Sequence, residues 1–478
     1  MITMPHLKSG KNVKLLFVAV LALTILTTLL LTTDPRCALT SQTADTIITP
    51  TGSFDNYRLS MNRNGNWRHL SPTQTASLSR LGRVLYLDED PPAARNRTFL
   101  ILVWKYGYTT HDRHMKQYSD KEVDPFARCA VKNCVVTYED AAAARADMVI
   151  LHLHRTENVE DMPPVRRPEQ IWAFSTDESP THTFLNGQHN FNAYNGLFNW
   201  SMHYRMDSDI PVPYGRTVAK RRIDNDRSFD FSAWLTNRSN TSPIAVMGSN
   251  CGSQNHRWEY VAELRKWIDV DFYGGCGTLE CPGHFTKDCP KLAAYRFYLA
   301  FENSNCDEYI TEKLWWNAYA KDAIPIVMGG APSRRNYAQL LPPHSYINVD
   351  DFASPRDLAF YLHYLLDAPD RLAEYFQWRR YFEVRNEHGY FQTPSYHYCR
   401  ACEALNYNDL TTKKTYTDLL GHWSEQTHCA AGWDMVQDRG HLESIQTVDG
   451  HIRRKLHAPN RFKFRPRGWP NYFGHSPA

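Results

Sequence analysis

A cation stands at an unusual place in the stretch FENSNCDEYITEKLWWNAYA, which covers residues 301–320. The stretch begins as the end of a strand and continues into a helix, so Lys313 falls in the first helical turn. Helix N-termini carry a partial positive charge and leave backbone N–H groups without intrahelical partners, which favours bound anions over cations. A bound phosphate would make the lysine favourable, and Glu302 and Glu312 could hold ribose or sugar hydroxyl groups. The alternative is a surface helix with a Glu/Lys pair.

A second cation, Arg257, occupies a similar position. The small polar loop SNCGSQNHR, residues 249–257, follows a strand and leads into a helix. Two cations at helix starts in one domain suit a diphosphate, whose growing charge they would neutralise as it leaves. The chain contains neither G-x-x-x-x-G-K-[ST] nor G-x-G-x-x-G, so a P-loop or a dinucleotide-binding fingerprint is unsupported. The net charge of +3 is too small to indicate nucleic acid as a partner.

Carboxylates follow a third strand, in the segment IWAFSTDESPTHT at residues 171–183. Asp177 and Glu178 lie just beyond the strand end, and a carboxylate presented there to a hydroxyl acceptor could act as a general base. The alternative for at least one of them is a turn acid or a helix cap. Asp207 and Asp209 form a D-x-D string, which binds a metal–nucleotide in some enzymes. Such strings arise often by chance, and we favour a structural role for this one.

The elements that must position these residues have the pattern of a two-domain α/β protein. Buried-strand patterns at 98–104, 147–152 and 171–175 are separated by longer segments, as in βαβ units with a parallel sheet. The charged break at 221–228 is typical of an interdomain linker. The second series then comprises strands at 229–235, 270–275, 296–302 and 323–327, a helix at 257–268, and a helix opened by Ser354 and Pro355. We therefore expect two α/β domains with a cleft between them.

The N-terminal residues predict a membrane anchor. Residues 15–33 form an uncharged run long enough to span a bilayer, and three lysines precede it. This asymmetry predicts an uncleaved signal anchor with a cytoplasmic N-terminus, whereas the alternative is a cleaved signal peptide. Residues 34–95 are rich in Thr, Ser, Asn and Arg and predict a stem. N-glycosylation sequons lie beyond the run at Asn96, Asn199, Asn237 and Asn240.

The cysteines predict an oxidising compartment, because all eleven lie beyond the apolar run. Six of them are disulfide candidates that fall in local pairs, namely Cys129 with Cys134, Cys276 with Cys281, and Cys399 with Cys402. The sequence does not fix their connectivity. A zinc site at the C-x-x-C pair is the alternative, although no second C-x-x-C or H-x-x-x-H pair accompanies it. The odd count leaves one thiol free or intermolecular, and Cys37 is a candidate.

Together these motifs resemble the signature of the α1,3-fucosyltransferases, which are Golgi type II membrane proteins of the GT-B fold. The resemblance rests on FENSNCDEYITEKLWWNAYAKDAIPIVMG, ESPTHT, LFNWSMHYRMDSDIPVPYG, the SN…R…Y…L pattern at 249–264, INVDDFASPRDLAFYL and CRAC, which occur in the family's order. It implies two Rossmann-like domains. The implied order is a cytoplasmic tail (1–14), the anchor (15–33), the stem (34–95), an acceptor-binding domain (96–222), a GDP-fucose-binding domain (223–405) and an extension without a known role (406–478).

The resemblance also implies a reaction, the transfer of L-fucose from GDP-β-L-fucose to the 3-hydroxyl of GlcNAc in glycoprotein glycans, with inversion at the anomeric carbon. Glu178 matches the family's proposed catalytic base. The residues that match its donor-binding positions are Arg257, Glu302, Asn303, Tyr309, Glu312 and Lys313. Enzymes of this kind need no bound metal for chemistry, and stimulation by Mn²⁺ is compatible with that expectation.

The expected partners are GDP-fucose, a glycoprotein glycan and the Golgi membrane, with the catalytic body in the lumen. A homodimer through the stem or the transmembrane segment is compatible with this architecture. One alternative is fucosylation of protein Ser/Thr or of another hydroxyl group. Another is an inactive Golgi sugar-binding protein, against which Glu178, Arg257 and Lys313 argue. The acceptor stays open between the innermost GlcNAc of N-glycans and outer lactosamine-type units.

Overall fold

The computed structural model describes residues 67–106, 124–184, 190–221, 229–238, 242–281, 287–329 and 333–433. The predicted anchor at 15–33, Cys37, Asn240 and the tail from residue 434 lie outside these ranges. Within them, none of the helices combines the length and the apolar character that crossing a membrane requires.

A parallel sheet of six strands, in the order β2-β1-β3-β4-β5-β6, carries the segment with Asp177 and Glu178. Its strands are β1 (Phe99–Val103), β2 (Cys134–Thr137), β3 (Met148–His152), β4 (Ile171–Ser175), β5 (Trp200–His203) and β6 (Ile210–Pro211). Every residue of β3, MVILH, is buried, as expected for a parallel strand covered on both faces. The strands predicted at 98–104, 147–152 and 171–175 are confirmed.

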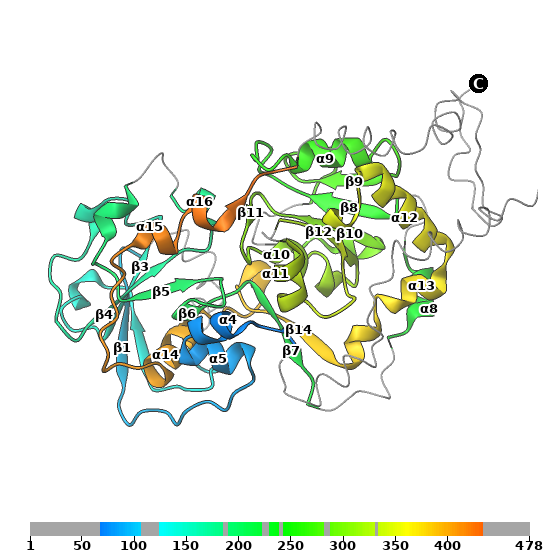
Figure 1. Cartoon of the computed structure of the whole chain (residues 1–478). Helices are drawn as coiled ribbons and strands as arrows, with labels where there is room; N and C mark the ends of the chain where they lie inside the picture. The colour runs from blue at the N-terminus through cyan, green and yellow to red at the C-terminus, as the bar shows by residue number, and fades with distance from the viewer. Residues whose placement is uncertain are drawn as a thin grey trace, which may run out of the picture. The chain divides into compact units, whose positions relative to one another are not determined.

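A second parallel sheet, in the order β13-β12-β10-β8-β9, carries the donor-side residues. Its strands are β8 (Ile244–Met247), β9 (Val270–Tyr273), β10 (Phe297–Phe301), β12 (Ile324–Met328) and β13 (Ile347–Asn348). Helices α9 (Arg257–Leu264) and α12 (Pro355–Asp367) pack against each other beside this sheet (Figure 1). Three of the strands confirm the predictions at 270–275, 296–302 and 323–327. The two parallel sheets confirm the α/β class with two Rossmann-like domains.

The predicted cap of the helix that begins after Ser354 is also confirmed. The Ser354 hydroxyl oxygen accepts the backbone N–H of Asp357 at 3.2 Å, and Pro355 is the first helical residue. Serine is a favourable N-cap, and proline at the first position loses no intrahelical hydrogen bond. The remaining helices of this half are α8 (Phe231–Thr236), α10 (Glu312–Trp315), α11 (Ser333–Leu340) and α13 (Pro369–Glu374).

Two short antiparallel pairs join segments that are far apart in the chain. Strand β7 (Gly215–Ala219) pairs with β14 (Phe382–Asn386), and β11 (Asn305–Cys306) pairs with β15 (Cys429–Ala430). Between β14 and β15, α14 (His397–Tyr407) contacts β1 and β6 of the first sheet. Helices α15 (Leu419–His422) and α16 (Glu425–His428) follow it.

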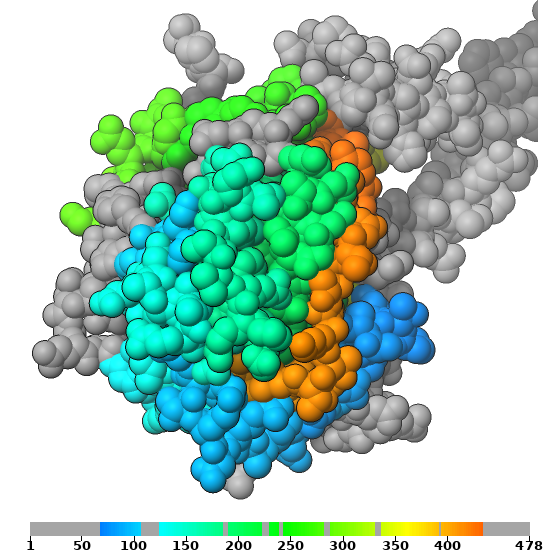
Figure 2. Space-filling model, turned by 90° about the vertical axis from the view of Figure 1, so that its left-hand side faces the viewer, coloured from blue at the N-terminus to red at the C-terminus, as the bar shows by residue number. Residues whose placement is uncertain are grey.

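Residues 408–433 belong to the predicted extension of unknown role, and the structure gives this part a defined place. In Figure 2 the orange chain of these residues runs along the surface beside the green segment of the first half. The indole of Trp423 is fully buried and donates from Nε1 to the Thr183 hydroxyl at 2.8 Å. We call residues 408–433 the C-terminal strap.

The stem prediction is wrong for residues 67–95. This segment contains α4 (Pro72–Ser77) and α5 (Arg80–Tyr86), and Leu81 and Tyr86 are buried. The guanidinium of Arg68 is also buried and donates to the backbone oxygen atoms of Gln339 and Thr217 at 2.6 and 2.7 Å. Its polar composition was misleading because capping serines and a buried arginine hold the segment to the folded body.

The strand predicted at 229–235 is wrong as well, because the structure has the helix α8 there. Asp230 caps this helix, since its carboxylate accepts the backbone N–H of Ala233 at 2.9 Å. The aromatic residues that suggested a strand instead pack on one side. The rings of Phe231 and Trp234 stack at 5.4 Å, and Trp234 contacts Phe376 at 4.7 Å.

The local cysteine pairs are not the disulfides. The structure joins Cys129 to Cys399 and Cys134 to Cys402, which attaches α14 to the edge of the first sheet. The other disulfides in the described ranges are Cys251–Cys276, Cys281–Cys289 and Cys306–Cys429. Cysteines that are close in the sequence are not paired, because α14, which carries CRAC, folds back onto β2, which begins at Cys134. Cys37 is the one cysteine beyond these ten.

Candidate active site

Glu178 follows the carboxyl end of β4 and is half-buried. The hydroxyl of Tyr309 donates to Glu178 Oε2 at 2.9 Å. Burial and the nearby carboxylates, that of Glu178 first, raise the pKa of Tyr309 well above 10, so the phenol stays a hydrogen-bond donor. Because Tyr309 belongs to the segment after β10, this hydrogen bond joins two of the predicted site segments.

A second contact joins the same two segments. The hydroxyl of Ser304 donates to the Ser179 hydroxyl oxygen at 2.7 Å, and Ser304 also lies 3.3 Å from the amide oxygen of Asn303. Asn303 is half-buried beside it. The structure therefore brings the acid after β4 and the predicted donor-binding stretch into direct contact.

Glu302 is the centre of the donor-side network. Its carboxylate is buried and accepts the backbone N–H of Thr311 at 2.7 Å and the Thr311 hydroxyl at 2.8 Å. Burial raises the pKa of Glu302, and the ammonium of Lys313 counters this effect. Gly329, at φ +146°, leaves room for the carboxylate stem, because a Cβ there would lie 3.0 Å from the Cβ of Glu302.

Lys313 has carboxylate partners in this network. Its Nζ lies 3.0 Å from Glu302 Oε2, 3.4 Å from Glu312 Oε1 and 2.8 Å from the Thr311 hydroxyl oxygen. Burial lowers the pKa of Lys313, but the carboxylates of Glu302 and Glu312 outweigh burial and the pKa is raised. The half-buried lysine thus has carboxylate partners beside the helix start that favour its charged form without a bound anion. Its contact with a pyrophosphate stays a prediction.

Arg257 reaches the same strand end from the other side. It is the first residue of α9, after His256 in the left-handed conformation at φ 57°. Its guanidinium is buried, donates to the backbone oxygen atoms of Phe301 and Asn250 at 2.9 and 2.8 Å, and lies 4.2 Å above the Trp258 ring. Burial lowers its pKa, which Glu302 opposes. The buried Nε of Arg257 has no hydrogen-bond partner in the described part of the chain.

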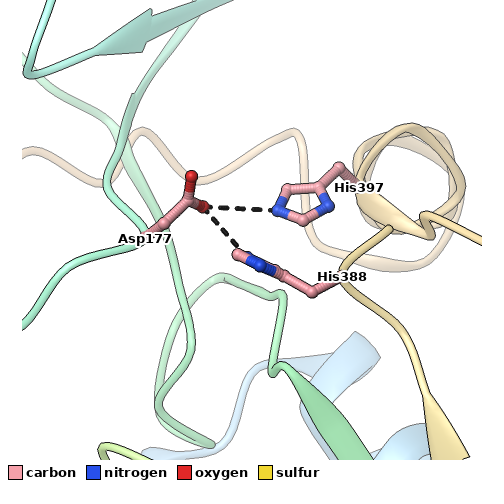
Figure 3. Close-up of side chains that lie close together, drawn as sticks. All are labelled: Asp177, His388 and His397. Carbon is pink, nitrogen blue, oxygen red and sulfur yellow. Dashed lines mark hydrogen bonds and ion pairs between the residues drawn. The ribbon is translucent and has the colours of Figure 1, made fainter. Parts of the chain in front are cut away.

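A further cluster surrounds Asp177, the neighbour of Glu178 (Figure 3). Asp177 Oδ1 lies 3.1 Å from His388 Nε2 and 3.4 Å from His397 Nε2, while Oδ2 lies 3.5 Å from His152 Nε2. All four side chains are buried. The sequence predicts only a base or a cap at Asp177 and carries no signal for His388 and His397, because they follow it by 211 and 220 positions with no metal-binding spacing.

The predicted structural role of the D-x-D string agrees with its contacts. Asp207 forms an ion pair with Arg205, and the Asp209 carboxylate accepts the backbone N–H of Ser201 at 2.9 Å and the ammonium of Lys414 at 2.8 Å.

Glu308 is a half-buried acid that no sequence motif indicated as a site residue. Burial raises its pKa to about 7, and its carboxylate accepts the backbone N–H of Met206 at 2.7 Å.

The sequons differ in what the fold permits. Asn96 and Asn237 are exposed, as a glycan requires. Asn199 is buried, its amide oxygen accepts the backbone N–H of Trp172 at 3.0 Å, and its amide nitrogen donates to the Lys414 oxygen at 2.9 Å. A glycan on the buried amide nitrogen of Asn199 would displace the packing around it, so the fold disfavours this predicted site. Asn240 lies outside the described residues.

Two family profiles match the chain. "Fucosyltransferase, N-terminal" matches residues 96–215, and "Glycosyltransferase family 10 (fucosyltransferase) C-term" matches residues 237–423. The chain is similar to glycoprotein 3-α-L-fucosyltransferase A of Drosophila melanogaster, with 36% identity over 68% of this chain and 61% of that relative, which is less than two thirds of its length.

Other relatives are matched over more of their length. The chain is 32% identical to α-(1,3)-fucosyltransferase 7 of Rattus norvegicus, over 67% of this chain and 79% of the relative. It is 36% identical to 4-galactosyl-N-acetylglucosaminide 3-α-L-fucosyltransferase FUT5 of Hylobates lar, over 66% and 78%. A solved structure of an α1,3-fucosyltransferase with GDP-fucose aligns at 17% identity and a TM-score of 0.40, over 71% of this chain and 98% of that one.

Proposed function

This chain belongs to glycosyltransferase family 10, the fucosyltransferases, and we propose that it transfers L-fucose from GDP-β-L-fucose to the 3-hydroxyl of GlcNAc in glycoprotein glycans. The observation that carries the proposal is the hydrogen bond of 2.9 Å between Tyr309 and Glu178. It joins a carboxylate able to act as a base to the stretch that contains Glu302, Glu312 and Lys313. Acid and donor-side cations are the two groups that such a transfer needs.

The proposed reaction is a single displacement. Glu178 removes the proton from the acceptor 3-hydroxyl, and the oxygen attacks the anomeric carbon of fucose as the bond to GDP breaks. The configuration inverts, the proton stays on Glu178, and the electron pair leaves with the diphosphate. A proton acceptor within reach of the nucleophile contributes typically 10²–10⁴-fold to such a rate.

The proposed donor site lies at the carboxyl end of β10. Arg257 and Lys313 stabilise the charge that develops on GDP, and the orphaned Nε of Arg257 supports an anion nearby. Glu302 and Glu312 hold Lys313 in place and, with Asn303 and Tyr309, contact the nucleotide sugar. No step of this mechanism uses a metal, and Mn²⁺ stimulation would act outside it.

The acceptor and the compartment are also part of the proposal. The names of two relatives specify different acceptors, a glycoprotein for one and a 4-galactosyl-N-acetylglucosaminide for the other. We propose residues 15–33 as a signal anchor that places the catalytic body in the Golgi lumen, because lysines precede the run. Protease protection of residues beyond the run in sealed Golgi vesicles would test the orientation.

The deciding experiment is a transfer assay with the purified full-length chain in detergent. GDP-fucose is offered with N-glycans that expose the innermost GlcNAc, with lactosamine-type oligosaccharides, and with Ser/Thr peptides. Mass spectrometry and linkage analysis of the product should show fucose at the 3-position of GlcNAc. Product on peptide hydroxyl groups would establish the Ser/Thr alternative instead. Absence of GDP release with every acceptor, despite GDP-fucose binding, would favour an inactive sugar-binding protein.

A further inference from the structure

The three side chains in Figure 3 converge on one point from two distant parts of the chain. Asp177 follows β4, whereas His388 and His397 lie between β14 and the first turn of α14. The ligand-type atoms of the three side chains lie within 4.8 Å of one another, and all three side chains are buried. Two imidazoles and a carboxylate form a donor set that zinc accepts.

The two separations from the carboxylate oxygen fit a tetrahedral ion. With bonds of about 2.0–2.1 Å, the ligand atoms of tetrahedral zinc lie roughly 3.3 Å apart. The distances from Asp177 Oδ1 to His388 Nε2 and His397 Nε2 are 3.1 and 3.4 Å. Such distances also fit N–H···O hydrogen bonds. The contacts of the other ring nitrogen of each histidine therefore help to decide whether Nε2 carries a proton or can bind a metal.

The contacts of the Nδ1 atoms distinguish His397, which can bind a metal through Nε2, from His152, which cannot. His397 Nδ1 lies 3.0 Å from the Ser395 hydroxyl, which can accept its proton and leave Nε2 unprotonated for a metal. His152 differs, because the backbone N–H of His154 donates to its Nδ1 at 3.3 Å. Its proton is therefore on Nε2, which faces Asp177 Oδ2 at 3.5 Å. His152 thus orients the carboxylate and is not a ligand itself.

The ring of His388 is held by its neighbours as well. The Tyr214 ring packs on it with centroids 3.8 Å apart, and the Tyr214 hydroxyl donates to the backbone oxygen of Asp177 at 2.8 Å. In metal sites, contacts of this kind around the ligands fix the orientation of the imidazole rings and the carboxylate.

We propose that Asp177 Oδ1, His388 Nε2 and His397 Nε2 bind one zinc ion, with water in the fourth position. The ion fastens the segment 388–397 to the end of β4, one residue before Glu178. It thereby acts as a positioning element for Glu178 and makes no contact with the donor. The binding of zinc does not depend on the proposed fucosyl transfer, since metal content is measured without any substrate.

The first test is the metal content of the full-length chain, purified in detergent through a tag without histidine and without chelators. Elemental analysis should find about one zinc per chain. After removal of zinc and addition of Co²⁺, visible absorption bands of a tetrahedral cobalt site should appear, and they should vanish when zinc is added. Less than a tenth of a zinc per chain together with no cobalt bands would overturn the proposal. Binding of manganese in place of zinc would overturn the assignment of the metal.

The second test compares a ligand with its matched non-ligand. Asp177→Asn and His397→Gln should each lower zinc affinity by more than about a hundredfold, while His152→Gln, which removes only an outer contact to the same carboxylate, should lower it by about tenfold at most. Equal zinc loss in all three variants would show a general effect on folding and would contradict the ligand assignment. If the ligand variants fail to fold, the cobalt spectrum of the unaltered chain still decides.

A readout beyond binding separates positioning from simple stabilisation. Removal of zinc from the unaltered chain should lower kcat for transfer while the affinity for GDP stays within about twofold, and added zinc should restore kcat. Loss of GDP affinity in parallel would place the ion at the donor and would contradict its role beside Glu178. If transfer itself is absent, the zinc content and the cobalt spectrum remain valid tests.

Discussion

The acids after β4 and the acids after β10 occupy equivalent places, each just beyond the carboxyl end of a parallel strand, but they are held in different ways. Glu302 is held by Thr311 and Lys313, which follow it by nine and eleven positions. Asp177 is held by His388 and His397, more than 200 positions away, and Glu178 by Tyr309. One network is local in sequence and the other is assembled by the fold.

The difference shows which contacts stabilise the charged side chains in each network. Around Glu302 a single short segment supplies both the acid and its cation, so the network forms as soon as that segment packs on β10. Around Asp177 the partners arrive only when the chain returns through β14 and α14. We therefore expect changes at Glu302 to lower local stability in addition to donor binding, and changes at Glu178 to act mainly on chemistry.

The largest effect is expected at Glu178. Glu178→Gln should lower kcat by about 10³-fold, because the amide cannot accept the acceptor's proton. GDP binding, measured by calorimetry, should stay within about twofold. Glu169→Gln is the matched control, an exposed acid of the same half. Near-normal turnover of the Glu178 variant would mean that the base is another residue.

Glu302→Gln should cost about 3 kcal/mol in the free energy of unfolding, since it leaves the half-buried ammonium of Lys313 without its nearest carboxylate. Denaturant unfolding followed by tryptophan fluorescence measures this. Adding Lys313→Met should recover part of the loss. Glu263→Gln, whose partner Lys266 is exposed, should cost under about 1 kcal/mol. Equal costs for Glu302→Gln and Glu263→Gln would show that burial adds nothing to the pair of Glu302 and Lys313.

The disulfide Cys306–Cys429 joins the donor-side stretch to the C-terminal strap across 123 positions. Replacing both cysteines with serine should cost about 2–4 kcal/mol, because the unfolded chain loses a long-range constraint. The melting temperature under non-reducing conditions measures this effect. The same double change at Cys281 and Cys289, which are only 8 positions apart, should cost less. A larger cost at the short loop would contradict this explanation.

The smallest effect is a pH dependence from Glu308, whose pKa is raised to about 7 by burial. The folded chain then holds this proton more tightly than the unfolded chain, so the contribution of Glu308 to stability falls as pH rises from about 4.5 to 7. Glu308→Gln should gain about 1–2 kcal/mol relative to the unaltered chain between pH 5 and pH 8, an amount reduced because the residue is half-buried. Melting temperatures at the two pH values measure it, and a parallel shift of both proteins would refute it.

The same division explains what the sequence could predict. Hydrophobic strand patterns and the Ser354 cap are local signals, and they gave the two parallel sheets and the start of α12 correctly. The convergence of Arg257, Glu302 and Lys313 on one strand end followed from the rule that parallel strands present their carboxyl ends together. The sequence predicted that a bound phosphate stabilises Lys313, but it did not predict that the carboxylates of Glu302 and Glu312 also stabilise this cation.

Most of the failures involve long-range contacts, whereas the strand predicted at 229–235, which is the helix α8, is a local failure. No spacing rule connects Asp177 with His388, or Cys129 with Cys399. The polar segment at 67–95 lacked a periodic pattern, yet it is fixed by a buried arginine whose partners lie 149 and 271 positions away. At Asn199 a sequon was recognised correctly as a pattern, but burial removes its amide from use.

The two disulfides to α14 can form only late in biosynthesis, after α14 has been translated. Cys129 and Cys134 must wait for partners 270 and 268 positions later, which at 5–20 residues per second is roughly 15–50 s of translation. During that interval the thiol nearest to each along the chain is the other, so a non-native bond between Cys129 and Cys134 can form first. Chains that form this bond require thiol–disulfide exchange after residue 402 has emerged, and the rate of that exchange is expected to depend on a disulfide isomerase.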